Sequence, residues 1–97
     1  MKKSELVTAL AARAKLTKSD AARAVEALFS SAGIIAQELR KGGKVLISGF
    51  GGFEARRRSA RRGRDPRTGR EIAIGASIAP VFRPGRGLKA ALDRRQS

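Results

Sequence analysis

Residues 54–74 read EARRRSARRGRDPRTGREIAI, and this stretch decides the architecture of the chain. It holds eight arginines against three acidic residues, which gives it a net charge of +5. Its only large apolar side chains are Ile72 and Ile74, so it cannot bury a core of its own. At its centre, residues 63–69 (GRDPRTG) are dense in turn-forming residues. The stretch therefore predicts two strands that meet at an exposed tip, forming a β-arm. The alternative is a segment that stays disordered without a partner.

The sequence before the arm predicts two helices. Apolar residues recur on one side at helical spacing, which predicts an amphipathic helix over Lys3 to Ala14. Thr17 is placed to cap a second helix, and Asp20 favours its positive end. The apolar residues then hold one phase for about five turns, until Gly42-Gly43 ends the helix. This pair resembles a helix-turn-helix in outline, but the second helix displays mostly Ala, Ser and Gln beside its apolar stripe. We interpret it as a core and dimer helix.

Strand and turn signals follow. Residues 44–48 (KVLIS) predict a strand, and the glycines of residues 49–53 (GFGGF) predict a sharp bend. A phosphate-cradling loop is the alternative, but the spacing fits neither the P-loop nor the dinucleotide fingerprint. After the arm, residues 85–92 predict a short closing helix, and residues 93–97 form a brief polar end. The inward side chains of the closing helix would be Leu88, Ala91 and Leu92.

We expect one domain over residues 1–97. Within it, residues 1–43 form a helical part for dimerisation. Residues 44–84 form a sheet whose β-arm covers about residues 54–74, and residues 85–97 form the final helix and tail.

Composition narrows the function classes. The chain has 97 residues with 22 Lys and Arg against 8 Asp and Glu, a net charge of +14, and a pI near 11.8. The positive charges repel one another, and binding to a polyanion would relieve this repulsion. We therefore favour nucleic acid over acidic lipid as the partner. The chain has no Cys and no His, and its eight acidic residues form no close pair. We therefore expect no disulfide, no metal, no cofactor and no enzymatic activity. Without a long apolar stretch, it is expected to be a soluble cytoplasmic protein.

The arm suggests a grip on DNA. A run of exposed basic residues is usually only a solvated surface. Here, however, every basic residue of the arm is arginine. The planar guanidinium of arginine can pair with phosphate oxygens and fits a narrow minor groove. Pro66 stands at the predicted tip between Arg64 and Arg67. It is either a turn-former only or a wedge between stacked bases.

Three motifs carry a resemblance to a known family. They are the bend at residues 49–53, the arm signature GRDPRTGREI at residues 63–72, and the ending FRPGRGLK at residues 82–89. Together with the two N-terminal helices, they resemble the bacterial histone-like HU and integration host factor family of DNA-bending proteins. The arm signature is highly specific, and the resemblance covers nearly the whole chain. It favours the HU side of the family.

The resemblance implies an α+β fold. Two N-terminal helices would form an intertwined dimer base, below a three-stranded antiparallel sheet with a long protruding β-arm and a short C-terminal helix. It implies a nucleoid-associated protein that binds duplex DNA with weak sequence preference through the minor groove, bends it and compacts the chromosome. The dimer would be a homodimer, or a heterodimer with a paralogue. The alternatives are a site-preferring subunit like integration host factor and an RNA-binding or ribosomal protein.

The resemblance also assigns site residues. Pro66 would intercalate at each arm tip. DNA contacts would come from Lys3, Arg56, Arg58, Arg61, Arg64, Arg67, Arg70, Arg83, Arg86 and Lys89. The dimer core would contain Phe29, Phe50, Phe53 and Phe82.

Three features depart from the family pattern. Asp65 replaces the usual Asn beside the tip proline, which brings a negative charge toward phosphate at a cost on the order of 1 kcal/mol or less. The helix before Gly42 is about three residues longer than the family norm. Gly87 falls inside the closing helix, where it should cost roughly 0.5–1 kcal/mol relative to Ala.

Overall fold

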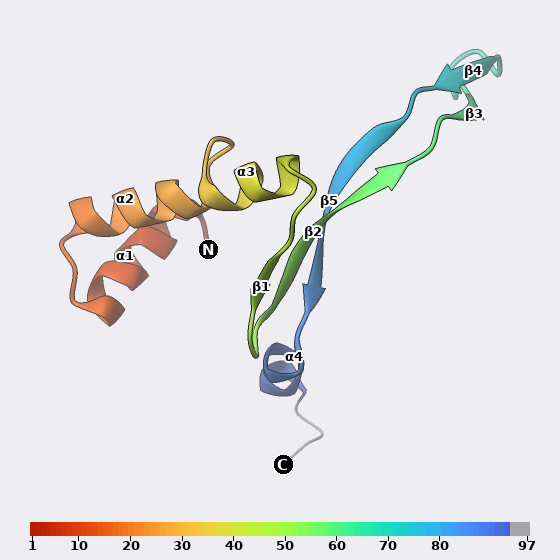
Figure 1. Cartoon of the computed structure of the whole chain (residues 1–97). Helices are drawn as coiled ribbons and strands as arrows, with labels where there is room; N and C mark the ends of the chain where they lie inside the picture. The colour runs from red at the N-terminus through yellow and green to blue at the C-terminus, as the bar shows by residue number, and fades with distance from the viewer. Residues whose placement is uncertain (94–97) are drawn as a thin grey trace. The chain divides into compact units, whose positions relative to one another are not determined.

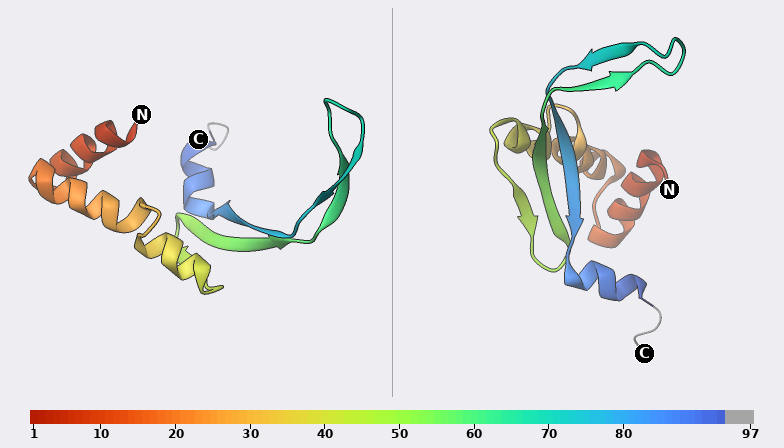
Figure 2. Two further views of the ribbon diagram at one scale, coloured as in Figure 1. Left: turned by 90° about the horizontal axis from the view of Figure 1, so that it is seen from above. Right: turned by 90° about the vertical axis from the view of Figure 1, so that its right-hand side faces the viewer.

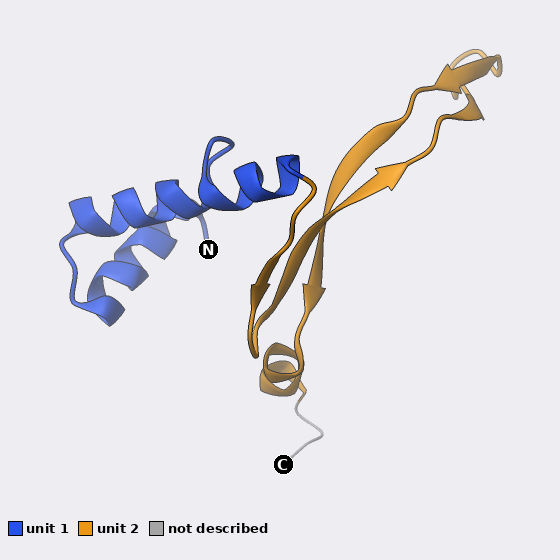
Figure 3. Cartoon of the chain, viewed as in Figure 1, with its two compact units in different colours: residues 1–41 blue, residues 42–97 orange. Residues whose placement is uncertain are grey.

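The structure is a computed structural model that describes residues 1–93. The polar end at residues 94–97 lies outside the described residues. The chain divides into two compact units, unit 1 over Met1–Lys41 and unit 2 over Gly42–Ser97 (Figure 3). Unit 1 is helical, whereas unit 2 holds the strands and a final helix, as the α+β prediction required.

Unit 1 begins with two helices that pack together (Figure 1). Helix α1 covers Lys3–Ala14, as predicted, and ends at Lys15, which adopts a left-handed conformation with φ 56°. Helix α2 covers Lys18–Phe29. The hydroxyl of Thr17 accepts a hydrogen bond from the backbone N–H of Asp20 at 3.1 Å, so the predicted cap is confirmed.

The second helix is not continuous, and the prediction of about five unbroken turns was wrong. Helix α2 ends at Phe29, and a separate helix α3 covers Ile34–Arg40. The turn between them covers residues 30–33, and three of its residues favour caps and turns over helix interiors: Ser30, Ser31 and Gly33. Gly33 is buried, and a Cβ there would lie 2.8 Å from the carbonyl oxygen of Ala27. The extra sequence before Gly42 therefore does not lengthen a helix.

Unit 2 contains a three-stranded antiparallel sheet in the order β1-β2-β5, as predicted. Strand β1 covers Val45–Ile47, β2 covers Gly51–Arg58 and β5 covers Ser77–Pro84. The predicted bend between β1 and β2 is a tight turn, in which the N–H of Phe50 donates to the carbonyl of Ile47 at 2.9 Å. Gly49 has φ 81° in this turn, a conformation that favours glycine.

The β-arm is a hairpin that continues from β2 and β5. Strands β3 (Arg61–Arg64) and β4 (Glu71–Ile74) form a separate two-stranded ladder that keeps the register of the β2–β5 pair. Ladder pairing is interrupted at two small residues on each strand, Ser59-Ala60 and Gly75-Ala76, which we call the joint. Figure 2 shows that the ribbon bends there. The prediction of two strands meeting at a tip is confirmed.

Helix α4 covers Arg86–Leu92 and docks by its first turn on the β1–β2 turn. The N–H of Leu88 donates to the carbonyl of Gly49 at 3.1 Å. A Cβ on Gly87 would lie 2.4 Å from that carbonyl oxygen, so glycine is required by close approach. The expectation that Gly87 merely costs stability relative to Ala was therefore wrong. Ala91 and Leu92 do not point inward either, because both are exposed in the single chain.

The single chain buries little. Four of the described residues are buried, and all of them lie in unit 1: Ala11, Ala21, Val25 and Gly33. In unit 2, three phenylalanines form an apolar cluster. Phe82 lies between Phe53 and Phe50, with ring centroids 4.9 Å and 5.7 Å apart. Phe82 is nevertheless 38% exposed, so the cluster is an open apolar surface rather than a closed core.

Candidate nucleic-acid interface

Strand alternation separates the sheet into an apolar and a charged face. Directly paired residues share a face, so the pairs Phe53–Phe82 and Ala55–Pro80 lie on one side with Val45. The alternate pairs lie on the other side of the sheet: Gly52–Arg83, Glu54–Val81, Arg56–Ala79 and Arg58–Ser77. We call this second side the charged face, and its charged residues are Lys44, Glu54, Arg56, Arg58 and Arg83. Three of the predicted DNA contacts are therefore brought together on one surface: Arg56, Arg58 and Arg83.

Glu54 is the centre of the charged face. The Nε of Arg83 donates to its Oε1 at 2.6 Å. The Nζ of Lys44 lies 3.5 Å from its Oε2, and the Nη2 of Arg56 lies 3.9 Å from its Oε1. One carboxylate thus contacts cations from three neighbouring positions of the sheet. Its side chain is only 18% exposed, whereas Lys44 and Arg83 are each 62% exposed.

The electrostatics of this cluster keep the carboxylate ionised. The hydrogen bond from Arg83 lowers the pKa of Glu54; partial burial opposes the shift, while the charges of Arg83 and Lys44 add to it. Because the pKa is lowered, the ion pairs are present at neutral pH and are lost only as the pH falls through that lowered value. Glu54 and Lys44 were both missed as site residues. The alternation of residues 54, 56 and 58 was the signal that could have found Glu54.

The distal arm distributes its charges on both faces. Arg61 shares a face with Ile72 and Ile74, according to the β3–β4 register. Arg64 lies on the opposite face, together with Glu71. The Nη1 of Arg62 lies 3.3 Å from Oε2 of Glu71. Glu71 therefore pairs with an arginine that was not among the predicted DNA contacts.

The tip is an ordered turn around Asp65. Its backbone N–H donates to the carbonyl of Arg70 at 2.8 Å, and its own carbonyl accepts from the N–H of Gly69 at 2.7 Å. Its Oδ1 also accepts from the N–H of Arg67 at 2.9 Å, a local turn bond that an asparagine side chain could make equally well. Gly69 has φ 71°. These bonds hold Pro66 exposed at the end of the arm.

The remaining predicted residues lie elsewhere in the two units. Arg86 and Lys89 are exposed on α4. Lys3, on α1, forms an ion pair with Glu26 on α2. Phe29, predicted in the dimer core, is 56% exposed at the end of α2.

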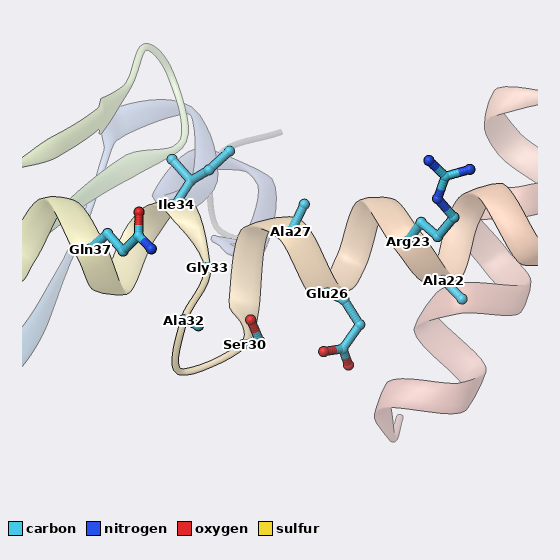
Figure 4. A pocket seen from close by; sticks show the side chains of 9 residues that line it. All are labelled: Ala22, Arg23, Glu26, Ala27, Ser30, Ala32, Gly33, Ile34 and Gln37. Atoms are coloured by element: carbon cyan, nitrogen blue, oxygen red, sulfur yellow. The ribbon is translucent and has the colours of Figure 1, made fainter.

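We also searched residues 1–93 for a metal site, a catalytic site and a membrane-spanning helix. No group of three or more Asp and Glu side chains is placed to hold a metal ion there. The open pocket beside the α2–α3 turn is lined mainly by small side chains, and Arg23 and Glu26 are its only charged residues (Figure 4). That lining offers no cluster suited to catalysis. Within the same residues, no helix is both long and apolar enough to cross a membrane.

Known proteins match this chain along almost its entire length. The family model described as bacterial DNA-binding protein matches residues 1–93. DNA-binding protein HU-1 of Halalkalibacterium halodurans is 50% identical over 93 residues, which are 96% of this chain and 100% of that protein. DNA-binding protein HU of Geobacillus stearothermophilus is 51% identical over 92 residues, 95% of this chain and 99% of that protein.

Solved structures match as well. The cocrystal structure of Anabaena HU with DNA has a TM-score of 0.87 and 36% identity, covering 97% of this chain and 99% of that one. HU from Thermotoga maritima has a TM-score of 0.65 and 28% identity, covering 96% of this chain and 100% of that one.

Proposed function

Since this chain belongs to the bacterial DNA-binding protein family, together with the HU proteins, we propose that it bends duplex DNA by gripping the minor groove with its β-arms. It is an architectural, nucleoid-associated DNA-binding protein and not an enzyme. The finer part of the proposal is weak sequence preference, with arginines holding phosphates and Pro66 wedging between bases at each tip. Such a protein would compact the chromosome by bending it.

The observation that carries the proposal is the continuity of basic side chains from sheet to tip. Arg56, Arg58 and Arg83 share the charged face, and the same hairpin continues through the joint into β3 and β4. Arginine forks suit phosphate oxygens, and phosphate contacts supply most of the affinity of such proteins without reading sequence. We propose that the remaining contacts come from Arg61, Arg64, Arg67, Arg70, Arg86, Lys89 and Lys3.

Competition binding tests the choice of partner. Labelled duplex DNA is bound to the protein, and unlabelled duplex DNA or structured RNA of equal length is added. We expect duplex DNA to compete more effectively, because an A-form helix presents a wide, shallow minor groove that an arm cannot enter in the same way. Equal or stronger competition by RNA would favour the RNA-binding alternative.

The wedge predicts a specific loss in Pro66→Ala. This variant should bind with a similar salt dependence but bend DNA less, because the arginines beside the tip remain while the rigid ring is gone. Bending is measured by energy transfer between dyes at the two duplex ends, at protein saturation. Arg67→Gln is the matched control, which should weaken binding yet preserve the bend once the duplex is saturated. Unchanged bending in Pro66→Ala would reduce Pro66 to a turn residue.

Asp65 predicts a gain of affinity in Asp65→Asn. Asparagine keeps the oxygen that accepts from the N–H of Arg67, but removes a negative charge from the tip. The affinity should rise by a factor of about 2–5, since an exposed charge is strongly screened. Binding isotherms at ~100 mM salt measure it. Asp65→Ala is the control: it removes the same charge but also the turn bond, and should gain less than Asp65→Asn.

We propose further that the functional unit is a dimer, with a second copy or a paralogue covering the apolar face. Phe50 is 44% and Phe82 38% exposed, and in unit 2 no described residue is buried. A small chain with so little core has few interactions to offset its chain entropy, and burial against a partner supplies them. Phe53 and Phe29 would join the shared core.

A further inference from the structure

Glu54 differs from the two other acidic side chains of the hairpin, Asp65 and Glu71. Asp65 and Glu71 each pair with one arginine, Arg67 at 3.9 Å and Arg62 at 3.3 Å. Glu54 contacts three cations, at 2.6, 3.5 and 3.9 Å. It also lies in the middle of the surface on which the proposed DNA contacts of the sheet gather.

We propose that Glu54 is an intramolecular competitor of DNA phosphate, which occupies Lys44, Arg56 and Arg83 and thereby lowers the affinity of the charged face for duplex DNA. The inference rests on the proposed DNA-binding function. It also assigns Lys44 as a DNA contact whose contribution Glu54 masks.

The competition between Glu54 and phosphate is electrostatic. The Nε of Arg83 already donates to Glu54 Oε1 at 2.6 Å, so a phosphate that pairs with Arg83 binds a guanidinium whose charge Glu54 partly neutralises. The two anions would then repel each other across one guanidinium, and this repulsion is weakly screened because the Glu54 side chain is only 18% exposed. DNA must therefore either leave the three cations with Glu54 or share them with it. In both cases, each cation contributes less than an unpaired one would.

A double-mutant cycle between Glu54 and Lys44 tests the proposal, with affinity for a straight duplex measured over a salt series. Glu54→Gln should bind about 10-fold tighter at ~50 mM salt and show a steeper salt dependence, because more phosphates can be neutralised. Lys44→Gln should weaken binding about 2-fold in the natural background and about 10-fold in the Glu54→Gln background. This coupling is the expected signature of a masked contact.

The control is Glu71→Gln, which changes the net charge by the same amount but frees one arginine instead of three cations. It should tighten binding by less than about 3-fold, as expected for a single exposed pair. Glu54→Asp provides a charge-conserving variant if Glu54→Gln folds poorly. Its shorter side chain withdraws the carboxylate, so it should bind tighter than the natural protein at unchanged net charge.

Three results would overturn the proposal: equal gains in Glu54→Gln and Glu71→Gln, the same Lys44→Gln effect in both backgrounds, or no gain in Glu54→Asp. The salt series of the natural protein separates this failure from a failure of the proposed function. A natural protein without salt-dependent DNA binding would remove the function itself.

Discussion

The affinity of this protein for duplex DNA should fall by about 10³–10⁵ when the salt concentration rises from ~50 to ~200 mM, for roughly 6–10 neutralised phosphates. The reason is the release of condensed counterions, which each phosphate contact displaces from the duplex. The proposed contacts that enter this count are Arg83 and six arginines of the arm: Arg56, Arg58, Arg61, Arg64, Arg67 and Arg70. Fluorescence anisotropy with a labelled duplex measures the affinity across this range.

Variants of the arm sharpen this prediction. Arg61→Gln should reduce the slope of log affinity against log salt by about one phosphate contact and weaken binding to all sequences alike. Arg62→Gln is the control. It should change the slope less than Arg61→Gln does, because Arg62 already pairs with Glu71 in the distal arm. A natural protein whose affinity is flat across the salt range would refute the electrostatic grip.

The second large effect is expected in Phe82→Ala. If a partner subunit covers the apolar face, this change removes the central ring of the Phe50–Phe82–Phe53 cluster from a buried interface. The loss should be roughly 3–5 kcal/mol of the free energy of unfolding. Urea denaturation at several protein concentrations measures it, since the stability of a dimer rises with concentration.

Leu46→Ala is the matched control. Leu46 is 76% exposed and pairs with Gly52 on the charged side of the sheet, so its truncation should change stability by less than about 0.5 kcal/mol. A concentration-independent unfolding midpoint in the natural protein would argue for a stable monomer. So would a loss below about 1 kcal/mol in Phe82→Ala, because a solvent-exposed ring contributes little.

Local signals in the sequence predicted the hairpin well. The turn residues around Pro66 and the lack of apolar side chains in the arm are properties of neighbouring residues, and the observed strands and tip follow from them. The first helix and the Thr17 cap were predictable for the same reason. Where short-range chemistry determines the backbone, the sequence alone sufficed.

The errors arose where distant contacts or competing signals decide. The apolar phase runs through residues 30–33, so periodicity suggested one helix, whereas the serines and a buried Gly33 end α2 at Phe29. Gly87 is explained by Gly49, which lies 38 positions earlier in the chain and approaches it only after the sheet and α4 have formed. The role of Glu54 likewise depends on strand register. Lys44 and Arg83 reach it from outside β2, and no spacing along the chain reveals their proximity.

If this protein bends the DNA that it binds, its affinity should be higher for a duplex that is already bent. A straight duplex and one of the same sequence, pre-bent by a central bulge of unpaired nucleotides, are bound in one buffer at ~150 mM salt. Bending a straight site costs on the order of 1–6 kcal/mol of free energy, and binding to the pre-bent duplex requires less of this bending energy. We expect at least about 10-fold tighter binding to the pre-bent duplex, whereas equal affinities would show that the protein does not bend DNA.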